Sequence, residues 1–156
     1  MNPVIAEQGD SMQFNELIPG LVLELGPREI TQQEILEFAG RYDPQYFHTD
    51  PVRATASRWG GLIASGWMTA SIAMQLVVAA ILEGSGSIGS PGLEKLEWLH
   101  PVRPGDLLHL KVTVLESRIS KSGVVGVVRW SWQMANQEAI VVLNLIATSL
   151  FDIKNP

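Results

Sequence analysis

The segment from Leu62 to Leu82 constrains the fold most, because it runs for 21 residues without a charged side chain. Its length would suffice to cross a bilayer. It is nevertheless rich in small and polar residues, and neither end carries the cluster of Lys or Arg that orients a membrane span. A helix that is apolar on all sides is also typical of a helix enclosed by a sheet. We therefore expect a buried central helix in a soluble protein that has no membrane partner.

Composition narrows the class of protein further. The chain has 156 residues, 46% of them hydrophobic, so one domain can bury a core without a disulfide or a metal. The absence of cysteine excludes disulfides, thiol catalysis and Cys-ligated zinc. The formal net charge is -5 and the 11 basic residues are scattered singly, which argues against a nucleic-acid partner. The first basic residue is Arg28, so a cationic targeting signal is missing and we expect a cytoplasmic protein.

Helical signals precede the apolar segment. A capping box at residues 31–34, followed by apolar residues at helical spacing, predicts a helix over residues 31–41. Pro44 disfavours helical geometry at Asp43, so we expect an extended loop over residues 43–51 and then a short helical turn over residues 53–57. The run of glycine and serine over residues 84–92 predicts a loop after the long helix.

The second half of the chain changes to the period of β-strands. Leu108, Leu110, Val112 and Val114 alternate with polar residues, as in a strand with one buried face. We expect further strands over residues 21–25, 93–99, 124–134 and 139–151. One long apolar helix and an antiparallel meander make an α+β arrangement, which favours a sheet curled around a single central helix.

The stretch from Tyr42 to Pro51 is the strongest candidate for chemistry. It places Asp43 and His48 five residues apart in a proline-bounded loop, where the two side chains could hold one water molecule. Imidazole exchanges a proton near neutral pH, and an adjacent carboxylate can tune and orient it. The alternative is that Asp43 caps a turn and His48 merely lies in a loop.

Three separated motifs favour the catalytic interpretation of Asp43 and His48 over the structural one. The Asp43/His48 loop is followed by a Trp-Gly-Gly turn that leads into Ser65-Gly66, and later by the turn Pro-Val-Arg-Pro-Gly-Asp at residues 101–106. In this order and spacing the chain resembles the MaoC-like dehydratases, the (R)-specific enoyl-CoA hydratase family of the hotdog fold. The resemblance covers about residues 14 to 152. It implies a single hotdog domain over residues 14–156, with an antiparallel sheet wrapped around a long central helix, after a polar tail over residues 1–13.

The resemblance also implies a reaction and a site. In such enzymes Asp43 and His48 would activate water for addition to a trans-2-enoyl thioester, giving an (R)-3-hydroxyacyl thioester. The N–H of Gly66, at the helix N-terminus, would face the thioester oxygen. Ser65 and Ser71 are further candidates for oxyanion or substrate binding. The family implies a homodimer that acts on an acyl-CoA-type thioester, and we expect no other cofactor and no metal. Whether the dimer pairs further, and whether the thiol carrier is coenzyme A or acyl carrier protein, stay open.

The chain departs from the family at two points. Gln45 and Tyr46 stand where the hydratase loop usually has Asn and Pro, and Ser65 stands where many hydratases have His. These changes keep the catalytic pair but leave the acyl group open. No acidic residue occurs between Leu62 and Leu82, although many hotdog thioesterases carry one on this helix, so hydration is favoured over hydrolysis. A hotdog thioesterase and a non-catalytic acyl-thioester-binding protein remain alternatives.

The remaining candidates have two interpretations each. Basic residues near the motifs could meet the phosphates of coenzyme A or be ordinary surface charges: Arg41, Arg53, Arg58 and Lys95. Tryptophans could line an acyl tunnel or belong to the core: Trp67, Trp130 and Trp132. The three histidines are too far apart in sequence to predict a zinc site.

Overall fold

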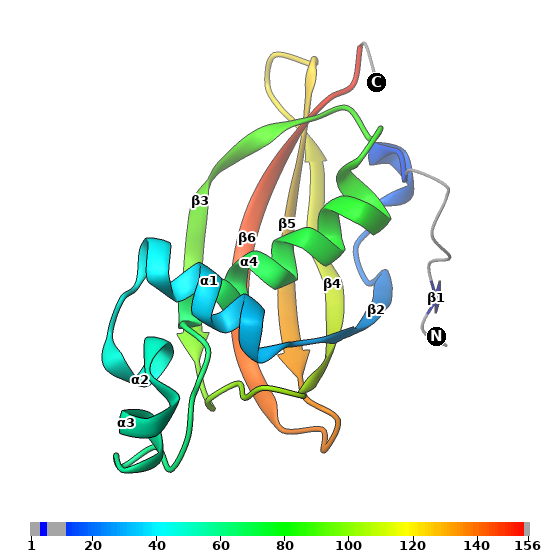
Figure 1. The fold of residues 1–156 in the computed structure, drawn as a ribbon. Coiled ribbons are helices and arrows are strands. Elements are labelled where there is room, and N and C mark those ends of the chain that lie inside the picture. The colour runs from blue at the N-terminus through cyan, green and yellow to red at the C-terminus, as the bar shows by residue number, and fades with distance from the viewer. Residues whose placement is uncertain (1–3, 6–11, 155–156) are drawn as a thin grey trace.

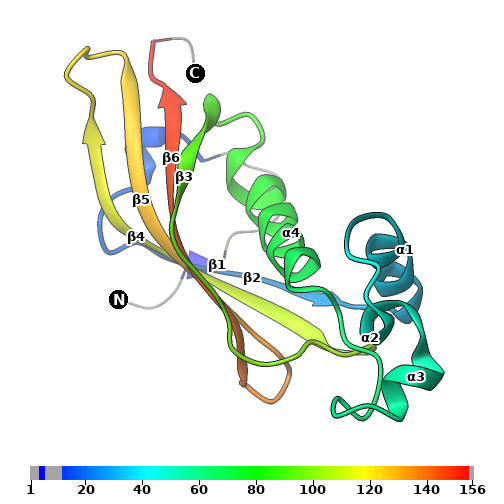
Figure 2. The same ribbon diagram turned by 90° about the vertical axis from the view of Figure 1, so that its left-hand side faces the viewer.

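A sheet of six strands curves around one long helix, as Figures 1 and 2 show from two sides. The computed structural model describes residues 4–5 and 12–154. The strands lie in the order β1-β2-β4-β5-β6-β3, and all neighbours are antiparallel except β1 and β2. Their bounds are Val4–Ile5 (β1), Val22–Glu29 (β2), Ser87–Trp98 (β3), Leu107–Ile119 (β4), Val125–Ala135 (β5) and Val141–Asp152 (β6). The predicted α+β arrangement is confirmed.

The helices lie between β2 and β3 in the sequence. They are α1 (Gln32–Tyr42), α2 (Tyr46–Thr49), α3 (Pro51–Thr55) and α4 (Gly66–Val77), which continues as one π-helical turn, η2 (Val78–Leu82). A short 3-10 turn, η1 (Phe14–Glu16), precedes β2. In Figure 2, α1, α2 and α3 gather beside the N-terminal end of α4, away from the strongly curved middle of the sheet.

The two faces of the sheet differ as the alternating sequence predicts. On β4, Leu108, Leu110, Val112 and Val114 are buried and pack with the inward side chains of β5 against α4. The outer face is polar, and Arg129 on β5 joins Glu94 and Glu116 of other strands through hydrogen bonds of 2.6 to 3.3 Å. The core therefore lies on one side of the sheet only.

The central helix is half enclosed. Its side toward the sheet is buried, with Met68, Ile72, Ala73 and Val77 in the core. On the opposite side Trp67 is 58% exposed, and Met74 and Val78 are exposed with it, at the spacing of one helical stripe. No helix among the described residues is long and apolar enough to cross a membrane.

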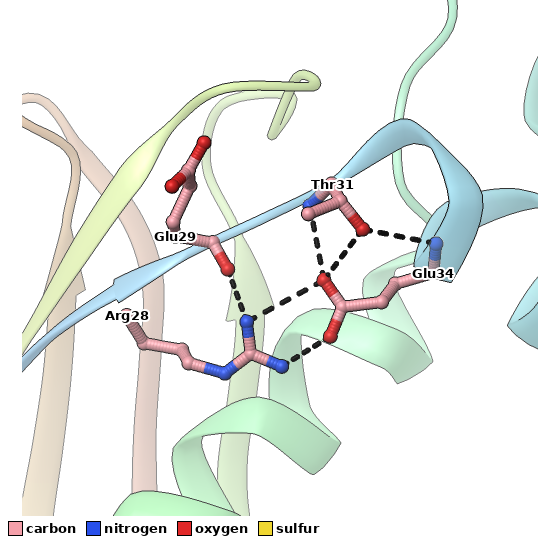
Figure 3. A network of polar contacts seen from close by, with 4 residues as sticks. All are labelled: Arg28, Glu29, Thr31 and Glu34. Atoms are coloured by element: carbon pink, nitrogen blue, oxygen red, sulfur yellow. Dashed lines mark hydrogen bonds and ion pairs between the residues drawn. The ribbon is translucent and has the colours of Figure 1, made fainter.

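An ion pair anchors α1 to the end of β2, as Figure 3 shows. The hydroxyl of Thr31 accepts a hydrogen bond from the Glu34 N–H, and the Glu34 carboxylate accepts one from the Thr31 N–H, which confirms the capping box. Arg28 on β2 donates to the same carboxylate and to the carbonyl of Glu29. The hydrogen bond from Arg28 is the main reason that the pKa of Glu34 falls from 4.5 to about 2. The start of α1 is therefore fixed to the sheet.

Two predicted loops contain more regular structure than expected. The loop over residues 43–51 includes α2, because Pro44 restricts only the residue before it and the chain turns again after Gln45. The loop over residues 84–92 ends at Gly86, since β3 already begins at Ser87. Gly89 and Gly92 adopt φ values of +129° and +145°, and their irregular backbone produces bulges while β3 stays paired with β6.

Most of the tail expected over residues 1–13 lies outside the described residues. Within it, Val4 and Ile5 pair in parallel with Leu23 and Glu24 of β2.

Candidate active site

Local structure brings Asp43 and His48 together. Asp43 ends α1, where its N–H donates to the Ala39 carbonyl, and His48 follows within α2. His48 is buried, with its side chain 7% exposed; its Nδ1 lies 2.7 Å from the Ile63 carbonyl oxygen and its Nε2 lies 3.3 Å from Oδ2 of Asp43. The pair is close enough for both side chains to contact one water molecule at its edge.

The Asp43 carboxylate is held by two neutral donors. The Gln45 amide donates to Oδ1 at 2.8 Å, and the Ser65 hydroxyl donates to Oδ2 at 2.7 Å. Burial raises the pKa of Asp43, but the two hydrogen bonds, together with the interaction with His48 when its ring is protonated, lower it by more, so the pKa lies below its usual range. Asp43 is therefore ionised at neutral pH, with both oxygens fixed in direction.

The contacts of His48 also decide which ring nitrogen can exchange a proton. A carbonyl oxygen can only accept a hydrogen bond, so the contact with Ile63 places a hydrogen on Nδ1. The Nε2 atom, which faces Asp43, is then free to gain or lose a proton. This arrangement suits a general acid and base whose orientation is set by the backbone.

The N-terminus of α4 supplies the third part of the site. Gly66 is the first residue of the helix, so its N–H has no intrahelical acceptor. Ser65 is the N-cap residue but makes no capping hydrogen bond with its side chain, because its hydroxyl is bound to Asp43. Unpaired N–H groups and the positive end of the helix dipole favour an oxygen that carries negative charge.

His48 and Gly66 line one mainly apolar pocket of about 270 Å³. Other walls come from Phe47, Trp59 and Trp98. The indole of Trp98 lies directly on Gly66: a Cβ atom added to this glycine would be 2.6 Å from two ring carbons. Glycine is thus required here by the close approach of the ring and not by its backbone angles.

The two remaining predicted site residues have different surroundings. Ser65 is buried, and its hydroxyl binds the carboxylate of Asp43. Ser71 is exposed, and its hydroxyl donates to the Trp67 carbonyl within the helix at 2.8 Å. It lines a second pocket of about 410 Å³ between α1 and α4, where neither His48 nor Gly66 takes part. The structure therefore joins Ser65, but not Ser71, to Asp43 and His48.

Sequence reasoning did not assign roles to Gln45 or Trp98. Gln45 appeared only as a departure from a motif, although an amide two residues after an aspartate could have suggested the hydrogen bond. Trp98 comes from a strand 32 residues beyond Gly66, so no local signal predicts their contact.

The other candidate residues lie in the core, on the surface or at the second pocket. Trp130 and Trp132 are buried beneath α4, which confirms the core interpretation for this pair. Lys95 forms an ion pair with Glu97 at 3.0 Å. Arg41 lines the pocket between α1 and α4. Within the part of the chain that the structure describes, no three side chains of His, Asp or Glu converge on a metal site.

Comparison with known proteins finds relatives of this chain. The model of the MaoC-like domain family matches residues 16–133. The uncharacterised protein YdeM of Bacillus subtilis is 30% identical over 131 residues, which are 84% of this chain and 92% of YdeM. Protein MaoC of Klebsiella aerogenes is 33% identical over 101 residues, 64% of this chain but 30% of that protein.

Solved structures agree with this family. The MaoC-like dehydratase from Rhodospirillum rubrum has a TM-score of 0.82 and 37% identity, over 91% of this chain and 97% of that one. The R-hydratase PhaJ1 from Pseudomonas aeruginosa shares the fold, with a TM-score of 0.77 and 22% identity over 91% and 86% of the two chains. Because the family model matches most of the sequence and the sheet encloses its helix as in these structures, the chain belongs to the MaoC-like domain family and has the hotdog fold.

Proposed function

We propose that this protein is a hydro-lyase that adds water to a trans-2-enoyl-CoA thioester, or removes it from the (R)-3-hydroxyacyl product. One observation carries the proposal: an ionised Asp43 touches His48, and His48 shares a pocket with the N–H of Gly66. Hydration needs a proton-exchanging group beside a donor to the carbonyl oxygen, and this pocket offers both. Membership of the MaoC-like family supports the same reaction class.

The geometry suggests how each group acts. A water molecule bound by Asp43 and His48 gives one proton to Nε2 of His48 while its oxygen forms a bond to the β-carbon of the enoyl group. The π electrons of the double bond move toward the thioester, and negative charge develops on its carbonyl oxygen. The Gly66 N–H stabilises this charge. Nε2 then returns the proton to the α-carbon on the same face, so that one water molecule has been added in the syn sense.

We also propose that the active form is a homodimer that pairs through β3 and the exposed side of α4. Among the described strands β3 has one neighbour, β6, so its other edge keeps unpaired backbone groups. Large apolar side chains are exposed on α4, on the turn that continues it and on β3: Trp67, Met74, Val78, Leu93 and Trp98. A second copy of the chain would cover both features in one symmetric contact. Light scattering should therefore give the mass of a dimer, reduced by Leu93→Lys but not by Ile119→Lys, a control at an exposed residue of β4.

The activity test uses crotonyl-CoA and a longer trans-2-enoyl-CoA, without added metal or cofactor. We expect loss of the enoyl thioester absorbance without release of free thiol. His48→Ala and Asp43→Asn should each lower kcat by about two to four powers of ten, the usual contribution of general acid–base catalysis, while circular dichroism stays unchanged. Thiol release would instead indicate a thioesterase, and near-normal hydration by either variant would overturn the assignment of the pair.

A further inference from the structure

Three arginine side chains border a cluster of aromatic rings at the wall of the pocket that contains His48. The guanidinium of Arg103 donates to the Trp59 carbonyl at 2.6 Å. The Arg58 guanidinium lies 5.7 Å from the centre of the Trp59 ring, and that of Arg53 lies 4.6 Å from the centre of the Tyr46 ring. None of the three forms an ion pair with a carboxylate among residues 12–154.

Aromatic contacts connect these arginines to the reacting groups. Phe47 packs against Tyr46, Trp59 and His48, with ring centres 5.2, 6.1 and 4.5 Å apart. Phe47 and Trp59 are themselves walls of the pocket. The three cations therefore border the same aromatic cluster that shapes the site and are not scattered over the surface.

The segment that carries Arg53 and Arg58 has basic but no acidic residues, and Asp50 just before it caps α3, where its carboxylate accepts from the Arg53 N–H at 3.0 Å. The chain carries a formal charge of -5, yet no acidic residue occurs from Pro51 to Leu82. Arg103 is half-buried, and the nearby Asp106 is occupied, since its oxygens accept from the Arg103 N–H at 2.8 Å and from Gln137 at 3.2 Å. A half-buried cation without a carboxylate is stabilised when an anion approaches it.

We propose that Arg53, Arg58 and Arg103 form a phosphate-binding rim that recognises the carrier of the acyl thioester. The inference rests on the proposed function, because it takes the thioester as the ligand of the neighbouring pocket. Guanidinium groups bind phosphate through paired, charge-assisted hydrogen bonds. The shared chemistry is the phosphate of phosphopantetheine, which occurs in coenzyme A and in the prosthetic group of acyl carrier proteins.

The test compares thioesters of one enoyl group that differ only in phosphate. The series is the pantetheine thioester, the 4′-phosphopantetheine thioester, the coenzyme A thioester and the acyl carrier protein thioester. Arg53→Gln, Arg58→Gln and Arg103→Gln should each raise KM for the coenzyme A thioester about five- to tenfold, without changing kcat, the size expected for one partly exposed charge-assisted contact. KM for the pantetheine thioester should not change. Arg118→Gln, at an exposed arginine of β4, is the matched control.

The series also separates the two carriers. A larger effect of the arginine variants on the coenzyme A thioester than on the 4′-phosphopantetheine thioester supports recognition of the additional phosphates of coenzyme A. Equal effects on these two and on the acyl carrier protein thioester support recognition of the phosphopantetheine phosphate alone. Arg103→Lys keeps the charge, so it should retain more affinity for the coenzyme A thioester than Arg103→Gln if phosphate binding is the role of this residue.

A binding measurement keeps the inference independent of turnover. The double variant Arg53→Gln/Arg58→Gln is titrated calorimetrically with free coenzyme A and with pantetheine. It should bind coenzyme A more weakly than the wild type does, while its affinity for pantetheine stays the same. Equal affinity of this variant and the wild type for coenzyme A, or no binding of coenzyme A to the wild type, would overturn the phosphate rim. Arginine-dependent binding of coenzyme A without turnover of any thioester would support the rim and reject the proposed function instead.

Discussion

Replacing Gly66 with alanine keeps the N–H group at the start of α4 and adds one methyl group beneath the indole of Trp98. The added Cβ atom would lie 2.6 Å from Cδ2 and Cε2 of the ring, whereas carbon atoms in good contact are about 3.5 to 4.0 Å apart. The ring must therefore move by about 1 Å, which disturbs its edge-on contact with Trp67, whose ring centre is 5.0 Å away.

Overpacking of this kind costs about 1 to 3 kcal/mol, so the free energy of unfolding should fall by that amount. Because Trp98 is 43% exposed and can swing outward, we expect a value in the lower half of this range. For a chain of this size, each kcal/mol lowers Tm by about 2 to 4 °C. Chemical denaturation followed by circular dichroism measures the change directly.

A double-mutant cycle with Trp98→Ala tests the cause. Once the indole is absent, Gly66→Ala should cost little, since alanine at a helical position with ordinary backbone angles is neutral or slightly stabilising. We expect a coupling free energy of about 1 to 2 kcal/mol between the two positions. If Gly66→Ala costs the same with and without Trp98, the steric argument is wrong.

The remaining predictions concern ionised groups. Ser65→Ala removes a hydrogen bond that lowers the pKa of Asp43. The acid limb of the profile of kcat/KM against pH should therefore move to higher pH. If this limb does not move, Asp43 does not control it. Gln45→Ala should act in the same direction, because Gln45 also donates to this carboxylate. The pKa of Glu34 is about 2 in the folded protein and 4.5 for an ordinary glutamate, the value taken for the unfolded chain. Its contribution to stability is therefore present above pH 4.5 and is lost as the pH falls toward 2. Glu34→Gln should therefore lower the free energy of unfolding by about 1 kcal/mol at pH 7, since solvent screens this partly exposed ion pair. Urea titrations near pH 2 should show almost no difference between the variant and the wild type.

Sequence patterns predicted the elements whose signals are local. Alternation along β4 and the capping box before α1 predicted both correctly, because a buried face and a capped end depend on residues a few positions apart. The early start of β3 was missed, since its Gly/Ser-rich part pairs through backbone groups and exposes nearly every side chain. Extended pairing of this kind is decided by β6 and not by the strand's own composition.

The same distinction applies to the site. Asp43 and His48 lie five residues apart and form a recognisable motif, and the structure places them in contact. The hydroxyl that orients Asp43 comes from Ser65, 22 residues away, and only the folded chain shows this bond. Ser71 lies one and a half turns of helix further on, too far round α4 to join the pair. Which residues support a motif is thus a question of tertiary packing.

The strand order has a consequence for the sequence of events during folding. Trp98 belongs to β3, and among the described strands β3 is held by β6, which comes later in the chain than all the others. A pairing between residues so distant in sequence forms slowly, because the intervening chain must be ordered first. During synthesis, His48 and Gly66 emerge well before the strand that secures the indole opposite them. The pocket therefore acquires its Trp98 wall only when β6 has docked against β3.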